Sequence, residues 1–253
     1  MTDFLMFAAI FIIGSVFGSF ITAASWRLPR EEDMLKTRSQ CPKCKATLKI
    51  PDLIPIFSWL LSRGKCRYCK SKISPRYVLT EIITGLLFVA LCWKFGLSAE
   101  FLIFAGLGVA LLILIISDFE TYIIPDSTTI ATIALGLIYQ YRIGADWFDM
   151  LYGVGAGVGI MLALRYVFYW ALKREALGWG DIKFMVGVGI WLGFPPLAFF
   201  MIISGVIGIV IGVIWKILFN SEEFPFGPSL AITLYFMVIF PEIHQALLCG
   251  FCS

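Results

Sequence analysis

Two aspartates stand where the hydropathy of this chain leaves little room for charge. Asp118 closes the apolar run 111–116, and Asp181 lies in the motif Gly-Trp-Gly-Asp-Ile-Lys that begins at Gly178. Ionisable groups at membrane segments cost free energy and usually serve a function. Two carboxyl groups that meet in a partly dehydrated place cannot both ionise cheaply, so one keeps its proton. The other can then act as a base, and the pair predicts acid–base hydrolysis.

Simpler interpretations of these aspartates exist. An aspartate at a helix end is commonly a solvated cap, and Asp118 has Glu120 and Asp126 near it around a short connection. A Gly-x-Gly-Asp pattern alone also occurs often by chance. The two carboxylates could instead form an ion or proton pathway in a transporter. A conduction path would place them deep within spans, whereas both are predicted at one membrane face, which favours an enzyme.

Four cysteines form a second constellation with metal-ligand spacing. Cys41, Cys44, Cys66 and Cys69 follow the pattern C-x2-C-x21-C-x2-C, in which two short knuckles can share one tetrahedral metal. Four thiolates favour a structural zinc ion, and a cytoplasmic location would keep the thiols reduced. A redox or disulfide role is the alternative. A further pair near the C-terminus, Cys249 and Cys252, is interpreted as incidental, with a disulfide as the alternative.

The composition predicts the elements that must position these residues. In 253 residues, 60% are hydrophobic and 15% charged, which exceeds the apolar content of a soluble domain of this length. We therefore expect an all-α polytopic membrane protein with about eight transmembrane helices. The predicted spans are 4–25, 78–95, 99–118, 127–142, 150–172, 182–194, 196–218 and 228–248.

The distribution of basic residues predicts the orientation. Thirteen of the 20 Lys and Arg residues lie between Arg27 and Arg76, so this segment is expected in the cytoplasm. Both termini then lie outside, and both aspartates lie at the cytoplasmic face. The expected domains are a first transmembrane helix (1–26), a cytoplasmic zinc-binding domain (27–77) and a transmembrane peptidase bundle (78–253). Anionic lipid headgroups explain the basic charge more simply than nucleic acid does.

The motifs along the chain resemble those of the bacterial type IV prepilin peptidases, a family of Gly-x-Gly-Asp aspartyl proteases. The resemblance runs from Gly-Ser-Phe at Gly18 and Arg-Leu-Pro at Arg27, through the paired Cys-x-x-Cys motifs and Glu81, to both aspartates. It ends with Pro-Phe-Gly-Pro at Pro225. Members of this family act as leader peptidase and N-methyltransferase in type IV pilus, type II secretion and competence systems.

The resemblance implies a function and a set of site residues. Asp118 and Asp181 would be catalytic, prepilins or pseudopilins the substrates, and S-adenosyl-L-methionine the methyl donor. The chain would reside in the bacterial inner membrane, with its active site facing the cytoplasm. From the residues themselves, we expect Gly178 and Gly180 to let a substrate strand approach. Lys183, which belongs to the motifs that carry the resemblance, is a further expected substrate contact. No residue is assigned to the methyl donor.

Two other charged residues have open interpretations. Glu81 lies in the first turns of a hydrophobic helix, where a helix-end role and a contact with substrate or methyl donor are both consistent with the sequence. Arg165 lies inside a predicted span; snorkelling to the interface is the default expectation, and pairing with a carboxylate is the alternative. Four alternating glycines, at 153, 155, 157 and 159, predict close helix contact.

Overall fold

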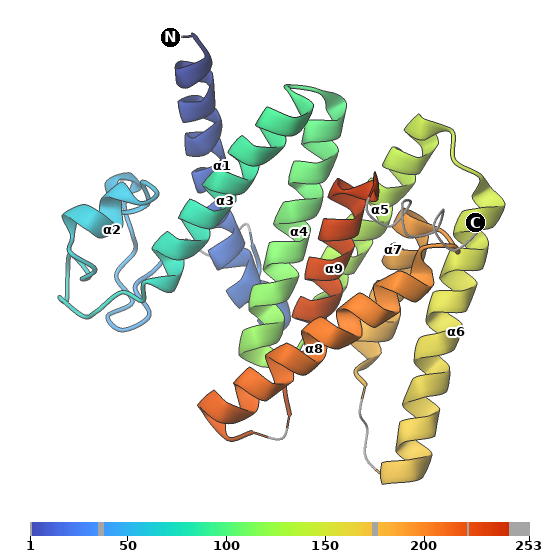
Figure 1. Cartoon of the computed structure of the whole chain (residues 1–253). Helices are drawn as coiled ribbons and strands as arrows, with labels where there is room; N and C mark the ends of the chain where they lie inside the picture. The colour runs from blue at the N-terminus through green and yellow to red at the C-terminus, as the bar shows by residue number, and fades with distance from the viewer. Residues whose placement is uncertain (1, 35–37, 174–176, 222, 243–253) are drawn as a thin grey trace. The chain divides into compact units, whose positions relative to one another are not determined.

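The computed structural model describes residues 2–34, 38–173, 177–221 and 223–242. It is helical (Figure 1), which confirms the predicted all-α class, and β-structure in the described residues is confined to two isolated bridges, Gln40 with Thr47 and Lys65 with Lys72. Cys249 and Cys252 lie outside the described residues. The elements are α1 (Thr2–Arg27), η1 (Leu28–Arg30), η2 (Ile50–Asp52), α2 (Phe57–Leu61), α3 (Arg76–Phe95), α4 (Ala99–Thr121), α5 (Asp126–Ile143), α6 (Trp147–Leu172), α7 (Trp179–Leu192), α8 (Leu197–Phe219) and α9 (Gly227–Ile239).

Five of these helices are long and apolar enough to cross a membrane: α1, α3, α4, α6 and α8. Helices also occupy the other three predicted spans, but α7 has 14 residues and α9 has 13. At about 1.5 Å per residue, α7 extends about 21 Å, less than the hydrocarbon thickness of about 30 Å. The multi-pass architecture is therefore supported, and the count of eight crossings stays a prediction.

The chain divides into two compact units, Met1–Ile113 and Leu114–Ser253, with the boundary inside α4. In the first unit, α1 packs along α3 through small residues. A Cβ added at Gly14 would lie 2.8 Å from the carbonyl oxygen of Thr84, and one at Gly18 would lie 2.5 Å from Cα of Glu81. Because glycine has no side chain, these two positions let the backbones of α1 and α3 approach closely. The cysteine segment, with η2 and α2, connects these two helices.

In the second unit, α7 is the central helix. Nine of its 14 residues are buried, and it contacts α5, α6 and α9. A Cβ added at Gly189 would lie 2.4 Å from the backbone nitrogen of Val154, so the backbones of α6 and α7 touch. Helix α8 lies obliquely across α9 (Figure 1).

The alternating glycines of α6 divide into two pairs. A Cβ added at Gly153 would lie 2.8 Å from the carbonyl oxygen of Gly189, and one at Gly157 would lie 3.0 Å from Cε of Met185, both on α7. Gly155 and Gly159 face open space instead. The predicted close contact is thus confirmed for the two glycines that lie four residues apart on one face of the helix.

Candidate functional site

Asp118 lies near the end of α4 and is almost fully buried, with 5% of its surface exposed. Its Oδ2 atom accepts a buried hydrogen bond of 2.9 Å from the backbone N–H of Gly227, the first residue of α9. A helix N-terminus presents unpaired N–H groups and a partial positive charge, which favours a carboxylate. A Cβ at residue 227 would lie 2.8 Å from this same oxygen. Glycine therefore allows the carboxylate of α4 to approach α9 closely.

Asp181 lies in the first turn of α7 and is also buried, with 8% exposed. Its Oδ2 atom accepts a hydrogen bond of 3.2 Å from the backbone N–H of Gly178, which precedes the helix. The Gly-Trp-Gly-Asp motif thus forms a helix start in which the acidic side chain turns back onto its own first turn. This local hydrogen bond fixes the Asp181 carboxylate at the N-terminal end of α7.

Asp118 and Asp181 both lie in the second unit, near helix ends that share an apolar neighbour. Ile124, in the connection between α4 and α5, packs against Gly180 at the start of α7 and against Gly227 at the start of α9. A Cβ at Gly180 would be 3.0 Å from Cβ of Ile124, and a Cβ at Gly227 would be 3.2 Å from its Cδ1. One apolar side chain therefore packs against the start of α7, which carries Asp181, and against the start of α9, which holds the Asp118 carboxylate by a hydrogen bond.

Aromatic residues brace the turn that follows Asp118. The ring of Trp215, on α8, stacks on Phe119 with centroids 5.5 Å apart. Its indole N–H donates a hydrogen bond of 3.1 Å to the hydroxyl oxygen of Tyr122, which lies at a positive φ of 55° just after α4. These contacts connect α8 to the residues on either side of the α4 end, and so to the position of Asp118.

Arg165 supports the segment before Asp181 from inside α6. Its guanidinium donates a hydrogen bond to the carbonyl oxygen of Leu177 and lies 4.7 Å from the centre of the Trp179 ring. The side chain is buried, with 8% exposed. Arg165 thus connects a membrane-capable helix to the start of the Gly-Trp-Gly-Asp motif, and its pairing with a carboxylate stays a prediction.

Lys183 and the two motif glycines were predicted to contact substrate. The structure places Lys183 on α7, two residues after Asp181, where its Nζ lies 2.8 and 3.0 Å from the two carboxylate oxygens of Asp126. Both side chains are more than half exposed. Gly178 donates to Asp181, and Gly180 packs against Ile124. The substrate contacts of these three residues stay predictions.

The four predicted metal ligands come together in the first unit. The Sγ atoms of Cys41, Cys44, Cys66 and Cys69 all lie within 4.8 Å of one another, and all four are free thiols. The Sγ atoms of Cys41 and Cys69 are 3.9 Å apart. Zinc–sulfur bonds of about 2.3 Å in a tetrahedron would place two sulfurs about 3.8 Å apart. The donor set and its spacing therefore fit a tetrahedral thiolate site for a metal ion.

The two knuckles of this site have the same backbone geometry. Lys45 donates to the carbonyl oxygen of Cys41, and Lys70 donates to that of Cys66, both at 2.9 Å. These two lysines have φ values of 58° and 59°. A hydrogen bond from the backbone of Cys44 lowers the pKa of the Cys41 thiol to about 6. Hydrogen bonds from Ser71 lower the pKa of the Cys69 thiol; the larger effect comes from the Ser71 hydroxyl and the smaller one from its backbone. These donors stabilise the thiolate forms of Cys41 and Cys69, whereas desolvation and the neighbouring thiols raise the pKa of Cys44 to about 11.

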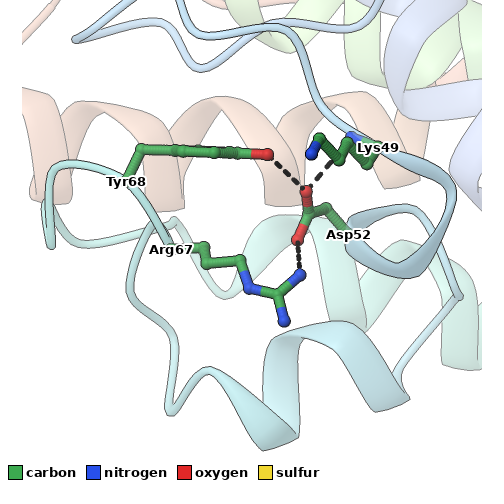
Figure 2. A network of polar contacts seen from close by, with 4 residues as sticks. All are labelled: Lys49, Asp52, Arg67 and Tyr68. Carbon is green, nitrogen blue, oxygen red and sulfur yellow. Dashed lines mark hydrogen bonds and ion pairs between the residues drawn. The ribbon is translucent and has the colours of Figure 1, made fainter.

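Asp52 connects the segment between the knuckles to the second knuckle (Figure 2). Its Oδ2 accepts from the backbone N–H of Lys49 at 3.1 Å and from the Tyr68 hydroxyl at 3.2 Å. Its Oδ1 lies 3.4 Å from Nη1 of Arg67. Desolvation and the Asp52 carboxylate raise the pKa of Tyr68. Tyr68 therefore stays a neutral donor that holds the second knuckle to η2.

Sequence reasoning missed the residues that support the aspartates. Gly227 was noted only within a family motif, and Ile124 and Trp215 were given no role. Gly227 lies 109 positions from Asp118, and no local pattern indicates such a contact. The available signal was a glycine immediately before a proline at a predicted helix start.

Comparison with known proteins assigns most of the chain to two family descriptions. Residues 12–95 match the Bacterial Peptidase A24 N-terminal domain, and residues 105–213 match the Type IV leader peptidase family. A relative from Pectobacterium carotovorum, named prepilin leader peptidase/N-methyltransferase, is 32% identical, with 89% of this chain and 90% of the relative covered. A protein of the same name from Neisseria gonorrhoeae is 31% identical, with coverages of 88% and 86%. No solved structure matches the chain.

Proposed function

This chain belongs to the type IV leader peptidase family, and we propose that it removes the leader peptide of type IV prepilin-like proteins and methylates the new amino terminus. The relatives that carry both activities in their names align with almost nine-tenths of the chain. The observation that carries the peptidase half is the burial of Asp118 and Asp181 at neighbouring helix ends in one unit. Secretion pseudopilins and pilus prepilins are both candidate substrates.

In the proposed mechanism the two carboxyl groups share one proton. The ionised carboxylate takes a proton from a water molecule, whose oxygen attacks the scissile carbonyl carbon while the protonated carboxyl donates its proton to the carbonyl oxygen. The tetrahedral intermediate then collapses, the carbon–nitrogen bond breaks, and a carboxyl proton passes to the leaving amine. The buried N–H of Gly227 supports this assignment because it orients one oxygen of Asp118 and leaves the other for chemistry.

We propose that the chain crosses the bacterial inner membrane eight times, with the aspartates and residues 27–77 in or facing the cytoplasm. Support comes from the basic segment 27–76 and from the order of the helices. Asp118 lies in the last turn of α4, Asp181 lies in the first turn of α7, and Gly227 is the first residue of α9. The short helices α7 and α9 would then begin below the membrane surface, which places buried carboxylates near the interface that the leader must reach.

We propose that the four cysteines hold one structural zinc ion in a domain of residues 27–77. The free thiols and the sulfur separations support this metal. When bound, zinc would hold the two knuckles together and so fix the fold of this domain. The methyl donor would be S-adenosyl-L-methionine, a proposal that rests on the names of the relatives, and no residue of this chain is assigned to it.

The test is incubation of the purified full-length protein with a synthetic prepilin peptide, with and without S-adenosyl-L-methionine, followed by mass measurement. We expect a leader fragment and a mature fragment in both reactions, and a gain of one methyl group on the mature fragment only when the donor is present. An intact peptide would overturn the peptidase proposal. Cleavage without any methyl gain would leave the peptidase and overturn the methyltransferase.

The two proposed activities should also separate by mutation. A peptide that already begins at the mature amino terminus needs no hydrolysis, so the Asp118→Asn and Asp181→Asn variants should still methylate it. Transfer of a labelled methyl group to such a peptide measures this. If wild type transfers the label and both variants fail, the two reactions use one site.

A further inference from the structure

The segment between the two cysteine knuckles carries a cluster of exposed apolar side chains that the proposed function does not use. Ile50 is 83% exposed and Leu61 is 85% exposed, and four further large apolar residues of η2, α2 and the connection between them are at least 40% exposed. We call this cluster the interface patch; it consists of Ile50, Leu53, Ile54, Phe57, Leu60 and Leu61. It lies outside every membrane-capable helix. Neighbouring exposed apolar residues of this kind mark an interaction surface.

Basic residues accompany the interface patch. Lys49 comes immediately before Ile50, the first residue of the patch, and Arg63 lies two positions after Leu61, its last residue. The whole segment from Arg27 to Arg76 has 13 Lys or Arg residues and four Asp or Glu residues, an excess of nine positive charges. Four zinc-bound thiolates would lower this excess by two charges. Apolar side chains beside basic ones are typical of segments that lie in the interface of an anionic membrane.

A hydrogen bond holds the interface patch at the level of a membrane-capable helix. The backbone N–H of Ile56 donates to Oε2 of Glu81 at 2.7 Å. Glu81 lies five residues into α3, which corresponds to about 7 Å inside the end of that helix. Glu81 is buried against α1, where a Cβ at Gly18 would contact its backbone. The start of α2 is therefore anchored beside two membrane-capable helices, α1 and α3.

The backbone at this anchor adopts a conformation that its residue type disfavours. Ile56 has φ 62° and ψ −55°, and the N–H of Phe57 approaches the carbonyl oxygen of Pro55 at 2.6 Å, as in a γ-turn. A β-branched residue at positive φ is an outlier, and such outliers persist where the surrounding structure holds them. The Glu81 carboxylate supplies that hold. The turn directs the chain from the anchor into Phe57–Leu61, the helix that carries half of the patch.

From these four observations we propose that the interface patch inserts into the membrane–water interface, where its apolar side chains contact acyl chains and Lys49 and Arg63 contact anionic headgroups. Glu81 is the positioning residue that holds α2 at this depth. The occupant is the lipid bilayer because both ends of the segment continue into membrane-capable helices and its charge complements anionic lipid. The inference is independent of the peptidase chemistry, since it concerns residues of the first unit only.

Site-specific photo-crosslinking of the full-length protein tests this proposal. A benzophenone amino acid replaces Leu61, or Ile50 in a second variant, and the protein is reconstituted into bilayers that contain phosphatidylglycerol and phosphatidylcholine. The same amino acid at Lys43, an exposed residue of the first knuckle outside the patch, is the matched control. After illumination, peptide mass measurement identifies what each position has captured. We expect phospholipid adducts at 50 and 61, several-fold more abundant than at 43, and enriched in phosphatidylglycerol relative to its share of the bilayer.

Other occupants would give other products. Capture of residues 114–253 of the same chain, or of an added prepilin peptide, without lipid adducts would overturn the proposal and make the patch a protein contact. Equal lipid capture at 43 and 61 would overturn the assignment of the patch as the inserted surface. Adducts that follow the bulk lipid ratio would overturn the role of anionic headgroups.

The anchor has its own test. Glu81→Ala removes the acceptor for Ile56 and should reduce lipid capture at Leu61 several-fold, whereas Glu81→Gln keeps an acceptor oxygen and should preserve it. Helix content and zinc content are measured on both variants to verify folding. If Glu81→Ala captures lipid as wild type does, Glu81 does not position the patch, and the insertion is judged by the first experiment alone.

Discussion

The cysteine knuckles and the aspartate pair are built in opposite ways. Each knuckle closes through backbone hydrogen bonds within a few residues, such as Lys45 to Cys41 and Lys70 to Cys66, and only one connection of 21 residues separates the knuckles. The aspartates come from helices α4 and α7, and Asp118 is oriented by an amide 109 residues away. The cysteine site therefore depends on local chain geometry, whereas the carboxylate site depends on the packing of the whole second unit.

This difference determines which changes each site tolerates. In the cysteine segment a change that spares the four thiols and the turns should leave the metal site intact. Around the aspartates the helices are in close contact: a Cβ added at Gly180 would lie 3.0 Å from Cβ of Ile124, and one at Gly227 would lie 2.8 Å from Oδ2 of Asp118. Interiors of this density transmit small displacements to the side chains they hold. The carboxylate site should thus be sensitive to changes that remove no catalytic group.

The largest expected effect is on leader cleavage by Asp118→Asn or Asp181→Asn. Each change removes an ionisable group from a pair that works by sharing a proton, and positioned acid–base groups contribute about 10² to 10⁴ in rate. We expect each variant to lose cleavage by at least this factor while remaining folded, measured by the mass of the products of a prepilin peptide. Asp146→Asn is the control, since Asp146 caps α6 and Asn caps equally well. Near wild-type cleavage by either variant would contradict its assignment.

A second change tests whether the support of Asp118 matters as strongly as the carboxylate itself. Gly227→Ala introduces a Cβ that would lie 2.8 Å from Oδ2 of Asp118, so the carboxylate must move. A displacement of about 1 Å in a catalytic group can cost about 10²-fold, and we expect kcat to fall by about 10- to 100-fold with KM little changed. Gly155→Ala is the matched control because its Cβ would meet open space. Equal kcat values for the two variants would show that Gly227 does not orient the carboxylate.

The same contrast explains what the sequence could predict. Apolar runs indicated the positions of helices α1, α3, α4, α5, α6, α7, α8 and α9, five of which are membrane-capable. The spacing of the cysteines indicated four side chains that the structure brings together. Asp118 and Asp181 were identifiable because charge is rare beside such runs. The α4–α9 contact and the placement of Ile124 were not, since they arise from packing between distant segments. The bounds of α7 were predicted too far toward the C-terminus, since the expected span was 182–194 and the helix runs from Trp179 to Leu192, where Gly193 caps it.

A third prediction concerns the metal site, where the expected effect on cleavage is smaller. Purified protein should carry about one zinc ion per chain, and Cys41→Ser or Cys66→Ser should each abolish zinc binding, because each removes one of four thiolates. Because the two knuckles have the same backbone geometry, the two variants should lose equal amounts of bound zinc. Elemental analysis measures the metal, and cleavage should fall far less than in the Asp118→Asn variant. Protein without zinc, with Cys41 and Cys44 joined by a disulfide, would contradict both the site and its cytoplasmic location.

The smallest expected effect separates two interpretations of Lys183. Its pair with Asp126 lies at the surface, with side-chain exposures of 55% and 66%, and exposed pairs contribute about 1 kcal/mol or less. If Lys183 only pairs with Asp126, Lys183→Gln and Asp126→Asn should have the same slight effect, and the double variant should add nothing. If Lys183 contacts substrate, as its position after the Gly-Trp-Gly-Asp motif predicts, Lys183→Gln alone should raise KM.

We expect the second outcome, in which Lys183→Gln raises KM. The kcat value should not change because the aspartates are untouched. Asp126→Asn should leave KM near that of wild type because it frees the ammonium group of Lys183 for substrate. Steady-state cleavage of one prepilin peptide by the two single variants and the double variant decides between them, and identical KM values in all three would remove Lys183 from the substrate site.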